Sequence, residues 1–479
     1  MSKYSLTALL LATSLATPAM AQDVDTLSEA LALTYETNPT LTGERAALRG
    51  DDAGVALARS GARPTLSAIA GINRDLTRSG ILESTQPKGP DLTVGADVSL
   101  PLFRGGQVKN GIKAAKARVD AGRASLRAVE GDVFVQAVAA YMDVRLNRDI
   151  VELNRNQVRV LDTNLQATSD RFEIGDVTRT DVAQSEARLQ LAQANLASAE
   201  GRLASAVETF REVIGVLPGD LAAPPPLPPL PQTAAEAVQI ALAYNADFDA
   251  VIANAQAARY DTRAAKGARL PSLSAVGSGT YLNALGSNPS AIPNTGTSTS
   301  VGLSSRIPIY QGGAPSARIR QAQAFEAQLL ERQVAVERAV VADARSAYAS
   351  YEAAQRAIAA NETAVEANEL ALEGTQLENS IGSRTILEVL NAEQELLNSQ
   401  VSLATARRDA YVAGFRLLDA MGQAEAEDLD LSAGALYDPL GNYRRVAGDI
   451  MDWSGDPDPV PVATSTRPVV SEGVTDADQ

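Results

Sequence analysis

Short motifs that recur after a constant spacing of 207 residues constrain the fold of this chain more than any other feature. The segment Pro101–Gly106 reads PLFRGG, and Pro308–Gly313 reads PIYQGG. The pair Ile174–Gly175 recurs in the same way as Ile381–Gly382. Because the offset stays the same from motif to motif, the simplest interpretation is a duplication of one structural unit. Any fold for this chain must therefore contain each element of that unit twice.

The repeat and the local composition together predict how the chain is divided. Lys3, the apolar stretch after it, and Ala19 and Ala21 are typical of a secretory signal peptide. The proline-rich run Pro224–Pro229 favours an extended linker between the copies. The predicted segments are a signal peptide at 1–21, a first repeat at 22–216, a Pro-rich linker at 217–232, a second repeat at 233–422, a C-terminal segment that packs on the body at 423–453, and a disordered acidic tail at 454–479.

Each copy is predicted to contain a helix, two strands, a long helix, a turn and a return helix. The first helix is expected over 27–62 and ends before Pro64. Apolar and polar residues then alternate along four segments, which are Leu66–Ile72, Leu92–Leu102, Leu273–Tyr281 and Val301–Ile309. Such strands suit both a membrane barrel and a half-buried soluble sheet, so the strands alone leave both interpretations open.

The long helices favour the membrane interpretation. No proline occurs from Gly106 to Phe172, and apolar residues recur there every seven positions. These residues are Val144, Val151, Val158 and Leu165. A seven-residue spacing is typical of a coiled-coil seam. A helix of about 67 residues would be ~100 Å long. That length suits a tube that crosses a wide aqueous gap better than it suits a compact domain.

The composition excludes several classes of function. The chain has no cysteine and no histidine, which removes disulfides, thiolate or His-ligated metal sites and His-based catalysis. A formal net charge of −16 disfavours nucleic-acid binding. We expect no cofactor and no enzymatic activity.

Membrane insertion would require several copies of the chain. No apolar run after the signal peptide is long enough for a membrane helix, so a membrane span would have to be built from strands. Four strands cannot close a barrel, and an open sheet edge cannot lie in lipid. We therefore expect an oligomer in which the copies pool their strands.

Three features in combination resemble the TolC family of outer-membrane channel proteins over about residues 23–425. They are the N-terminal TLSEALALTYETNP at 26–39, the two strand-to-helix joints at 101–106 and 308–313, and the two helical turns at 171–182 and 379–396. The resemblance implies a mainly α fold with transmembrane β-strands. Four strands per protomer would contribute to a trimeric, twelve-stranded outer-membrane β-barrel, continued by a long periplasmic α-helical barrel.

The resemblance also implies a function and a set of partners. The chain would be the outer-membrane exit duct of a tripartite export system in a Gram-negative bacterium, passively conducting small toxic compounds, secreted proteins or both. It would act as a homotrimer in outer-membrane lipid, with a periplasmic adaptor (membrane fusion) protein and an inner-membrane ABC or proton-driven exporter. The alternative is a trimeric coiled-coil, adhesin-type surface protein with a β anchor. The duplication argues against it, because strands occur midway in both copies.

The resemblance assigns residues to a periplasmic gate. Glu388 and Asn391 match the constriction positions, and Arg384 matches a latch residue whose partner would be Asp181. Arg384, Glu388 and Asn391 share one helical face by their spacing. The same spacing also fits an ordinary ion pair on a solvated helix, so both interpretations stay open. Asn391 replaces an acid that is usual in the family, which would weaken a preference for cations.

Two further groups of residues follow from the turns and joints. Hairpin tips and adaptor docking are expected at Gly175, Asp176, Thr178, Gly382 and Ser383. The strand-to-helix joints are expected at Pro101, Gly105, Gly106, Pro308, Gly312 and Gly313. Glycine suits both places because it ends helices and permits sharp changes of direction.

Overall fold

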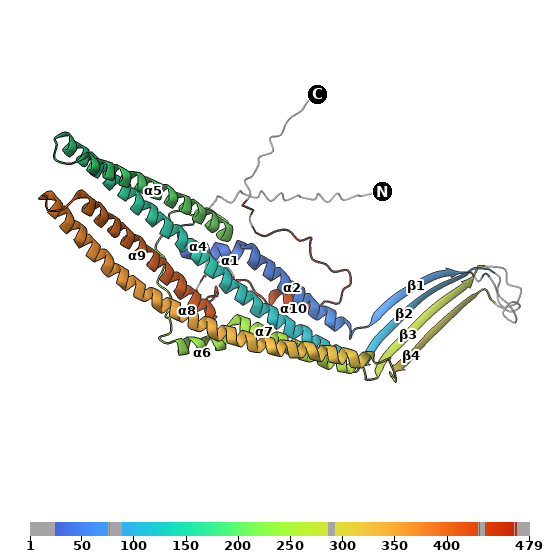
Figure 1. Ribbon diagram of the computed structural model, residues 1–479. Helices are drawn as coiled ribbons and strands as arrows, with labels where there is room; N and C mark the ends of the chain where they lie inside the picture. The colour runs from blue at the N-terminus through green and yellow to red at the C-terminus, as the bar shows by residue number, and fades with distance from the viewer. Residues whose placement is uncertain are drawn as a thin grey trace, which may run out of the picture.

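The chain is elongated, with long helices side by side and a curved sheet that leaves one end of the helical body (Figure 1). The computed structural model describes residues 24–74, 76, 89–285, 293–429, 431, 436–463 and 465–466. The signal peptide expected at 1–21 lies outside the described residues. Within the described ranges, none of the helices carries an apolar stretch long enough to cross a membrane.

The first helix of each copy is broken, so the single helix expected over 27–62 is wrong. The four helices are α1 (Leu27–Thr37), α2 (Pro39–Ser60), α6 (Ala234–Tyr244) and α7 (Ala246–Gly267). Asn38 explains the first break. Its backbone is extended at ψ 127°, and its side chain accepts a hydrogen bond from the Thr40 backbone N–H at 2.9 Å. Pro39 then occupies the first position of α2, where it needs no hydrogen-bond partner.

Four strands form one antiparallel sheet in chain order. They are β1 (Thr65–Asn73), β2 (Asp91–Arg104), β3 (Ser272–Ala284) and β4 (Thr295–Arg306). Leu66 pairs with Val98, which is linked through Gly277 to Val301, so one face of the sheet carries an apolar row. The adjacent row, on the other face, is polar and consists of Ser67, Asp97, Ser278 and Ser300. The register therefore confirms the predicted alternation.

One end of the expected strand pattern is wrong. Strand β4 ends at Arg306, so Ile307 and Ile309 lie in the joint to the next helix. Pro308 has no N–H to donate, which prevents the ladder from continuing. The equivalent Pro101 is tolerated inside β2 because the pairing with β3 shifts register just after it.

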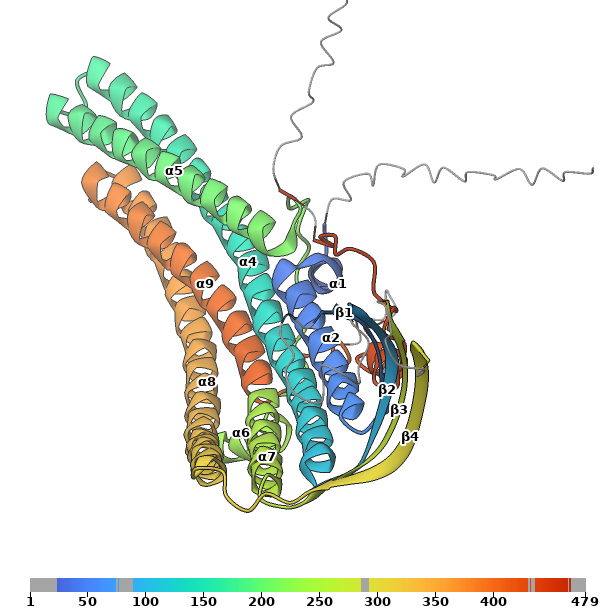
Figure 2. The same cartoon turned by 90° about the vertical axis from the view of Figure 1, so that its right-hand side faces the viewer.

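Two helices of 67 residues each, α4 (Gln107–Glu173) and α8 (Ala314–Ser380), form the long axis and confirm the predicted length. Helix α5 (Arg179–Ile214) returns beside α4, and α9 (Ile386–Ala420) returns beside α8 (Figure 2). A short helix near the C-terminus, α10 (Gly441–Val446), packs against α2.

Each return helix stops partway along its partner, and a second helix continues its line. The Asn38 side-chain amide donates to the Val213 carbonyl oxygen at 3.0 Å, which joins the end of α5 to the start of α2. The Asn245 amide donates to the Ala420 carbonyl oxygen at 3.3 Å, which joins α9 to α7. The two junctions are equivalent by the 207-residue offset.

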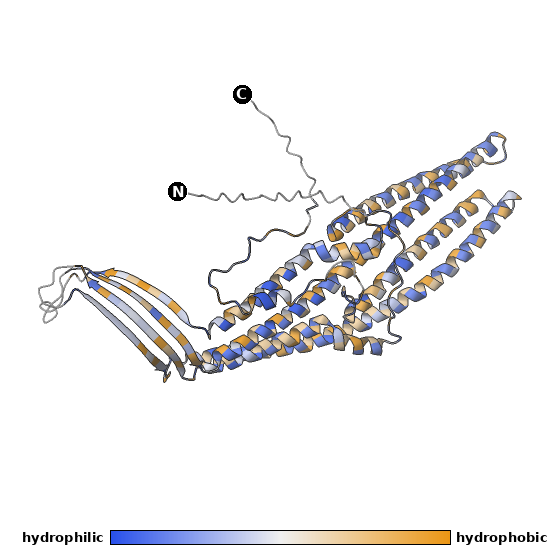
Figure 3. Ribbon diagram, turned by 180° about the vertical axis from the view of Figure 1, so that it is seen from behind, coloured by the Kyte–Doolittle hydropathy of each residue, from blue (hydrophilic) through white to orange (hydrophobic). Residues whose placement is uncertain are grey.

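The main core lies at this level of the body. Phe134, Tyr141 and Phe210 are fully buried, and burial of one such side chain contributes ~2–3 kcal/mol. The Tyr141 hydroxyl also hydrogen-bonds the carbonyl oxygens of Asp25 (3.0 Å) and Ala222 (2.8 Å), so it ties the N-terminal segment and the linker to α4. Figure 3 shows apolar residues recurring along the helices and alternating with polar ones along the strands.

Candidate gate at the helical hairpin ends

The α4–α5 turn is shaped by one glycine and one cap. Gly175 has φ 82°, a left-handed conformation that favours glycine, and it follows the last turn of α4. Thr178 begins α5 with a capping box: its hydroxyl oxygen accepts from the Asp181 N–H (3.3 Å), and the Asp181 carboxylate accepts from the Thr178 N–H (2.8 Å). Asp176 accepts a hydrogen bond from Arg171 Nε at 2.8 Å.

The α8–α9 turn repeats this backbone. Gly382 has φ 78°, and the Ser383 N–H and hydroxyl both donate to the Glu378 carbonyl oxygen, at 2.9 and 3.0 Å. Thr385 begins α9 with a capping box in which Glu388 accepts from the Thr385 N–H at 2.9 Å. The two hairpin ends therefore have the same turn geometry.

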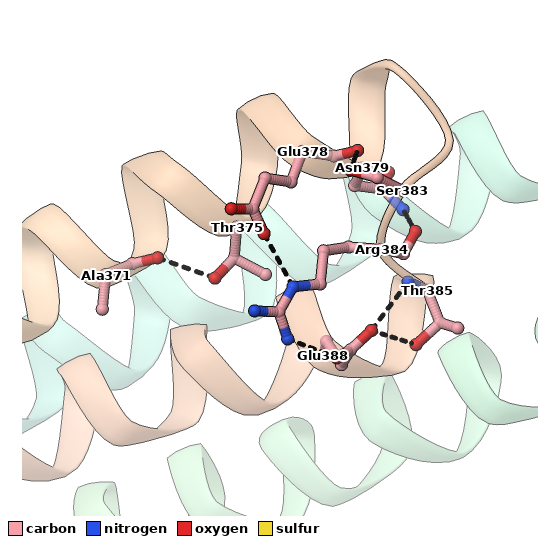
Figure 4. A network of polar contacts seen from close by, with 8 residues as sticks. All are labelled: Ala371, Thr375, Glu378, Asn379, Ser383, Arg384, Thr385 and Glu388. Carbon is pink, nitrogen blue, oxygen red and sulfur yellow. Dashed lines mark hydrogen bonds and ion pairs between the residues drawn. The ribbon is translucent and has the colours of Figure 1, made fainter.

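The second turn adds a charge network that the first lacks (Figure 4). Arg384 Nε donates to Glu378 at 2.7 Å, and its Nη1 donates to Glu388 at 2.6 Å. Hydrogen bonds from Thr385, followed by that from Arg384, lower the pKa of Glu388 to about 2. The hydrogen bonds to Glu388 and then to Glu378 raise the pKa of Arg384. Glu388 therefore stays ionised into acidic solution, with an arginine bound to it.

The structure does not bring the expected latch pair together within one protomer. Asp181 is used to cap α5, and Arg384 is held between two glutamates of its own hairpin. Among the described residues, no ion pair joins Arg384 to Asp181. Glu388 and Asn391 do share one stretch of α9, as their spacing predicts.

The hairpins are instead connected by residues that sequence reasoning missed. Arg188 on α5 donates to the Asn391 Oδ1 atom on α9 at 2.7 Å. Deeper in the wall, the Asn164 amide on α4 donates to both oxygens of the buried Glu393 on α9, at 3.0 and 3.2 Å. No motif marks Arg188 or Asn164, because their role depends on how α4, α5 and α9 lie together.

The strand-to-helix joints turn through paired glycines. Gly105 and Gly106 have φ 58° and 79°, and Gly312 and Gly313 have φ 60° and 79°. Within each joint, the second glycine precedes the first residue of the long helix. The glycines expected at the joints thus have a conformation that a side chain would disfavour.

A second polar feature lies where α9 ends. A cavity of about 1480 Å³ lies between α4, α7, α8 and α9, and five aspartates are among its lining residues. They are Asp132, Asp247, Asp343, Asp409 and Asp419. Burial, followed by repulsion from Asp132 and Asp247, raises the pKa of Asp419 to about 7. Within the described ranges, no group of three or more acidic side chains is arranged to hold a metal ion.

Comparison with known proteins identifies a family. The model of the family described as "Outer membrane efflux protein" matches residues 30–216 and 237–423. The chain is 35% identical over 422 residues to the outer membrane efflux protein BepC of Brucella suis biovar 1, covering 88% of this chain and 90% of that protein. It is 27% identical over 368 residues to the outer membrane protein TolC of Escherichia coli K12, covering 71% of this chain and 73% of TolC.

The fold is similar to that of solved outer-membrane proteins. The crystal structure of VceC from Vibrio cholerae matches with a TM-score of 0.72 at 20% identity, covering 83% of this chain and 96% of VceC. Proteins of this family are channels of the Gram-negative outer membrane with a large periplasmic helical portion, and they work with an adaptor and an inner-membrane pump. They are not enzymes. The chain therefore belongs to the outer membrane efflux protein family, and its function is that of an exit duct for export across the outer membrane.

Proposed function

We propose that three copies of this chain close into one conduit, with twelve pooled strands in the outer membrane and the helical hairpins pointing into the periplasm. The number three rests on the family resemblance. Closure itself is supported by the edges of the protomer: β1 and β4 are the two ends of the sheet, and β4 is exposed along its whole length. An open edge of this kind needs a partner strand when the sheet lies in lipid.

The unequal surroundings of the two joints carry this proposal. A Cβ atom on Gly105 would lie 2.3 Å from the Gly267 carbonyl oxygen, so the joint of the first copy is packed tightly on α7. At Gly312, a Cβ atom would meet no atom of the described residues within 4 Å. The residue equivalent to Gly267 is Ser60, at the end of α2. We infer that α2 of the next copy covers Gly312 as α7 covers Gly105.

The long helices give the same indication. Helix α4 is buried along much of its length, whereas in the described chain α8 buries only Ile319, Val340 and Ala344. Large apolar side chains on α8 such as Phe325 and Leu370 are exposed. A neighbouring copy would remove this apolar surface from water, which stabilises association by ~25 cal/mol per Å².

Within this conduit, Glu388 and Asn391 would form the narrowest rings at the hairpin ends. Because Arg384 does not reach Asp181 within a protomer, a latch between them has to form between neighbouring copies. The Arg188–Asn391 hydrogen bond would hold the two hairpins of one copy together in the closed state. Opening would then require separation of α9 from α5.

The tips of the hairpins would receive the adaptor. Ile174 and Ile381 are equivalent residues and are 81% and 80% exposed, one immediately before each turning glycine. Each is flanked by the polar groups expected for docking, which are Asp176, Thr178 and Ser383. An apolar side chain with a polar rim is a typical contact surface between proteins.

The test of the duct is made in a strain that lacks its own exit duct. Expression of this chain together with its cognate adaptor and pump should lower the accumulation of small toxic compounds or restore secretion of an exported protein. The purified chain should also run as a trimer and conduct ions in planar bilayers. A monomer without conductance would contradict the proposal. The compound or protein that is exported identifies the cargo class.

A further inference from the structure

Residues 449–456 form a turn that satisfies its own polar groups. The Asp449 Oδ1 atom accepts from the Met451 N–H at 2.9 Å, and its Oδ2 atom accepts from the Ser454 hydroxyl. The Ser454 N–H donates to the Met451 carbonyl oxygen at 3.3 Å. Arg445 closes the base of the turn through two hydrogen bonds to Asp456, at 2.6 and 3.0 Å.

The same turn presents large apolar side chains outward. Ile450 is 72% exposed, Met451 is 70% exposed and Trp453 is 99% exposed. Trp453 is also the only tryptophan in the chain. A turn whose polar groups largely hydrogen-bond one another and whose large apolar side chains are exposed is suited to a surface that is less polar than water.

Contacts with the last turn of α2 and with the residues just after it place this turn at the end of the helical body. Arg59 donates to the Ala447 carbonyl oxygen at 2.6 Å. Arg63 donates to the Gly448 carbonyl oxygen at 3.1 Å and also to that of Asp449. Arg63 precedes the first residue of β1, Thr65, by two positions. Figure 1 shows the chain after α10 running close to the end of α2. The turn therefore stands where the helices give way to the sheet.

This level is the membrane boundary on the periplasmic side if the sheet spans the outer membrane, so the inference rests on the proposed function. Tryptophan and apolar side chains are favoured in the headgroup layer, where an amphipathic ring meets both lipid and water. The exposed Asp452 limits the depth to that layer, because a carboxylate remains hydrated there. The charges of Arg445 and Asp456 are paired with each other.

We infer that the 449–456 turn is an interfacial membrane anchor, in which Ile450, Met451 and Trp453 enter the phospholipid headgroup layer on the periplasmic side of the outer membrane. The anchor fastens the C-terminal segment, and through Arg59 and Arg63 the end of α2, to the bilayer surface. It would fix the height of the helical body relative to the membrane.

The single tryptophan makes a direct test possible. The full-length protein is reconstituted into vesicles of phosphatidylethanolamine and phosphatidylglycerol, with or without phospholipid brominated near the headgroup. We expect Trp453 fluorescence to be blue-shifted relative to a solvent-exposed tryptophan and to lose at least half its intensity with the brominated lipid. Asp449→Ala, which opens the turn, should lessen this quenching at least twofold without loss of oligomer on native gels; unchanged quenching would contradict the role of the turn.

Two matched variants in a Trp453→Phe background separate this inference from the proposed function. Leu66→Trp places the reporter on β1, and Ile174→Trp places it at the α4–α5 tip. Quenching of the first and not of the second supports the membrane position of the sheet. If Trp453 is then unquenched and accessible to acrylamide, the anchor is wrong and the duct stands. A blue-shifted but unquenched Trp453 means burial by a neighbouring copy and also overturns the anchor. If the tryptophan of Leu66→Trp is not quenched, both the membrane position of the sheet and the anchor are wrong.

Discussion

The two copies of the repeat are most alike in backbone and least alike in charge. At the hairpin ends, Gly175 and Gly382 have φ angles of 82° and 78°, and a capping box begins the return helix in both copies. The first turn holds one ion pair between Arg171 and Asp176, whereas Arg384 at the second turn binds two glutamates. Duplication has kept the geometry that a hairpin requires and has changed the charges, which are free to vary on an exposed turn.

The two copies also differ in how far the rest of the chain covers them. The first copy is covered by the second within the chain, and the second copy is left open at Gly312 and along α8. In the proposed conduit, such a duplicated chain contains one of its two interfaces and would form the equivalent one with another copy. Each prediction below compares a residue of one copy with a residue of the corresponding region in the other.

The largest effect is expected at the joints. Gly105→Ala forces a Cβ atom against the Gly267 carbonyl oxygen and places it at φ 58°, so we expect a loss of ~3 kcal/mol in folding stability, from backbone conformation and overlap together. Gly312→Ala carries only the backbone cost, ~1 kcal/mol, within the protomer. Thermal unfolding measures the first effect. Native gels measure trimer formation, which Gly312→Ala should weaken; an intact trimer of normal stability would contradict a neighbour at that joint.

The second largest effect on folding stability is expected from Asp419, one of the aspartates that line the cavity. Asp419 has a pKa raised from 3.8 to about 7 by burial and by Asp132 and Asp247. At a pH between these two pKa values, Asp419 is protonated in the native state and ionised in the unfolded chain. The stability that Asp419 contributes is therefore largest at acidic pH and is lost as the pH rises through 7. Asp419→Asn should therefore raise the free energy of unfolding at pH 8, on the order of 2 kcal/mol, and change it little near pH 4.

The matched control for this substitution is Glu212→Gln. Glu212 is the equivalent residue of the first copy and is exposed at the end of α5. Because this side chain is exposed, we expect Glu212→Gln to differ little from the wild-type protein in melting temperature at both pH 4 and pH 8. A melting temperature of Asp419→Asn that follows the wild-type pH profile would show that the carboxylate cluster does not titrate in this range.

The smallest effect on folding stability is expected from substitutions at the hairpin tips. These substitutions are tested by measuring channel conductance. Arg384→Ala removes both ion pairs of the second turn and any contact that Arg384 makes with a neighbouring copy. We expect the resting conductance in planar bilayers to rise severalfold, while Arg171→Ala at the first turn leaves it near the wild-type value. Equal conductance of the two variants would remove the distinction between the hairpins as gate elements.

Sequence reasoning predicted the elements whose signals are local. The 67-residue helices followed from the absence of proline and from seven-residue spacing, and the strands followed from alternation. The break before Pro39 was also marked locally, by an asparagine followed by a proline, but the expected helix ran through it. Where a capping side chain and a proline occur together, they outweigh the helical periodicity on either side.

The contacts between hairpins could not be predicted in this way. The Arg188–Asn391 bond joins residues on α5 and α9, which are brought together mainly by the packing of α4 against α9, and exposed arginines occur all along the chain. The latch that we propose between Arg384 and Asp181 would in addition require a second copy. The charge network at Arg384 was partly predictable from the sequence. Glu388 lies four residues after Arg384 and is marked by that spacing, whereas Glu378 lies on the other side of the turn and is not.

The junctions at Asn38 and Asn245 have a mechanical consequence. A continuous helix transmits torsion along its length through its backbone hydrogen bonds. At these two points the helical line is interrupted, and the hydrogen bond across each interruption runs from one side-chain amide to one carbonyl oxygen. Torsion in α5 or α9 is therefore not passed to α2 or α7 through helical hydrogen bonds. It reaches them only through this hydrogen bond and through side-chain packing, so the packed core at this level determines how far rotation of the hairpins disturbs the sheet.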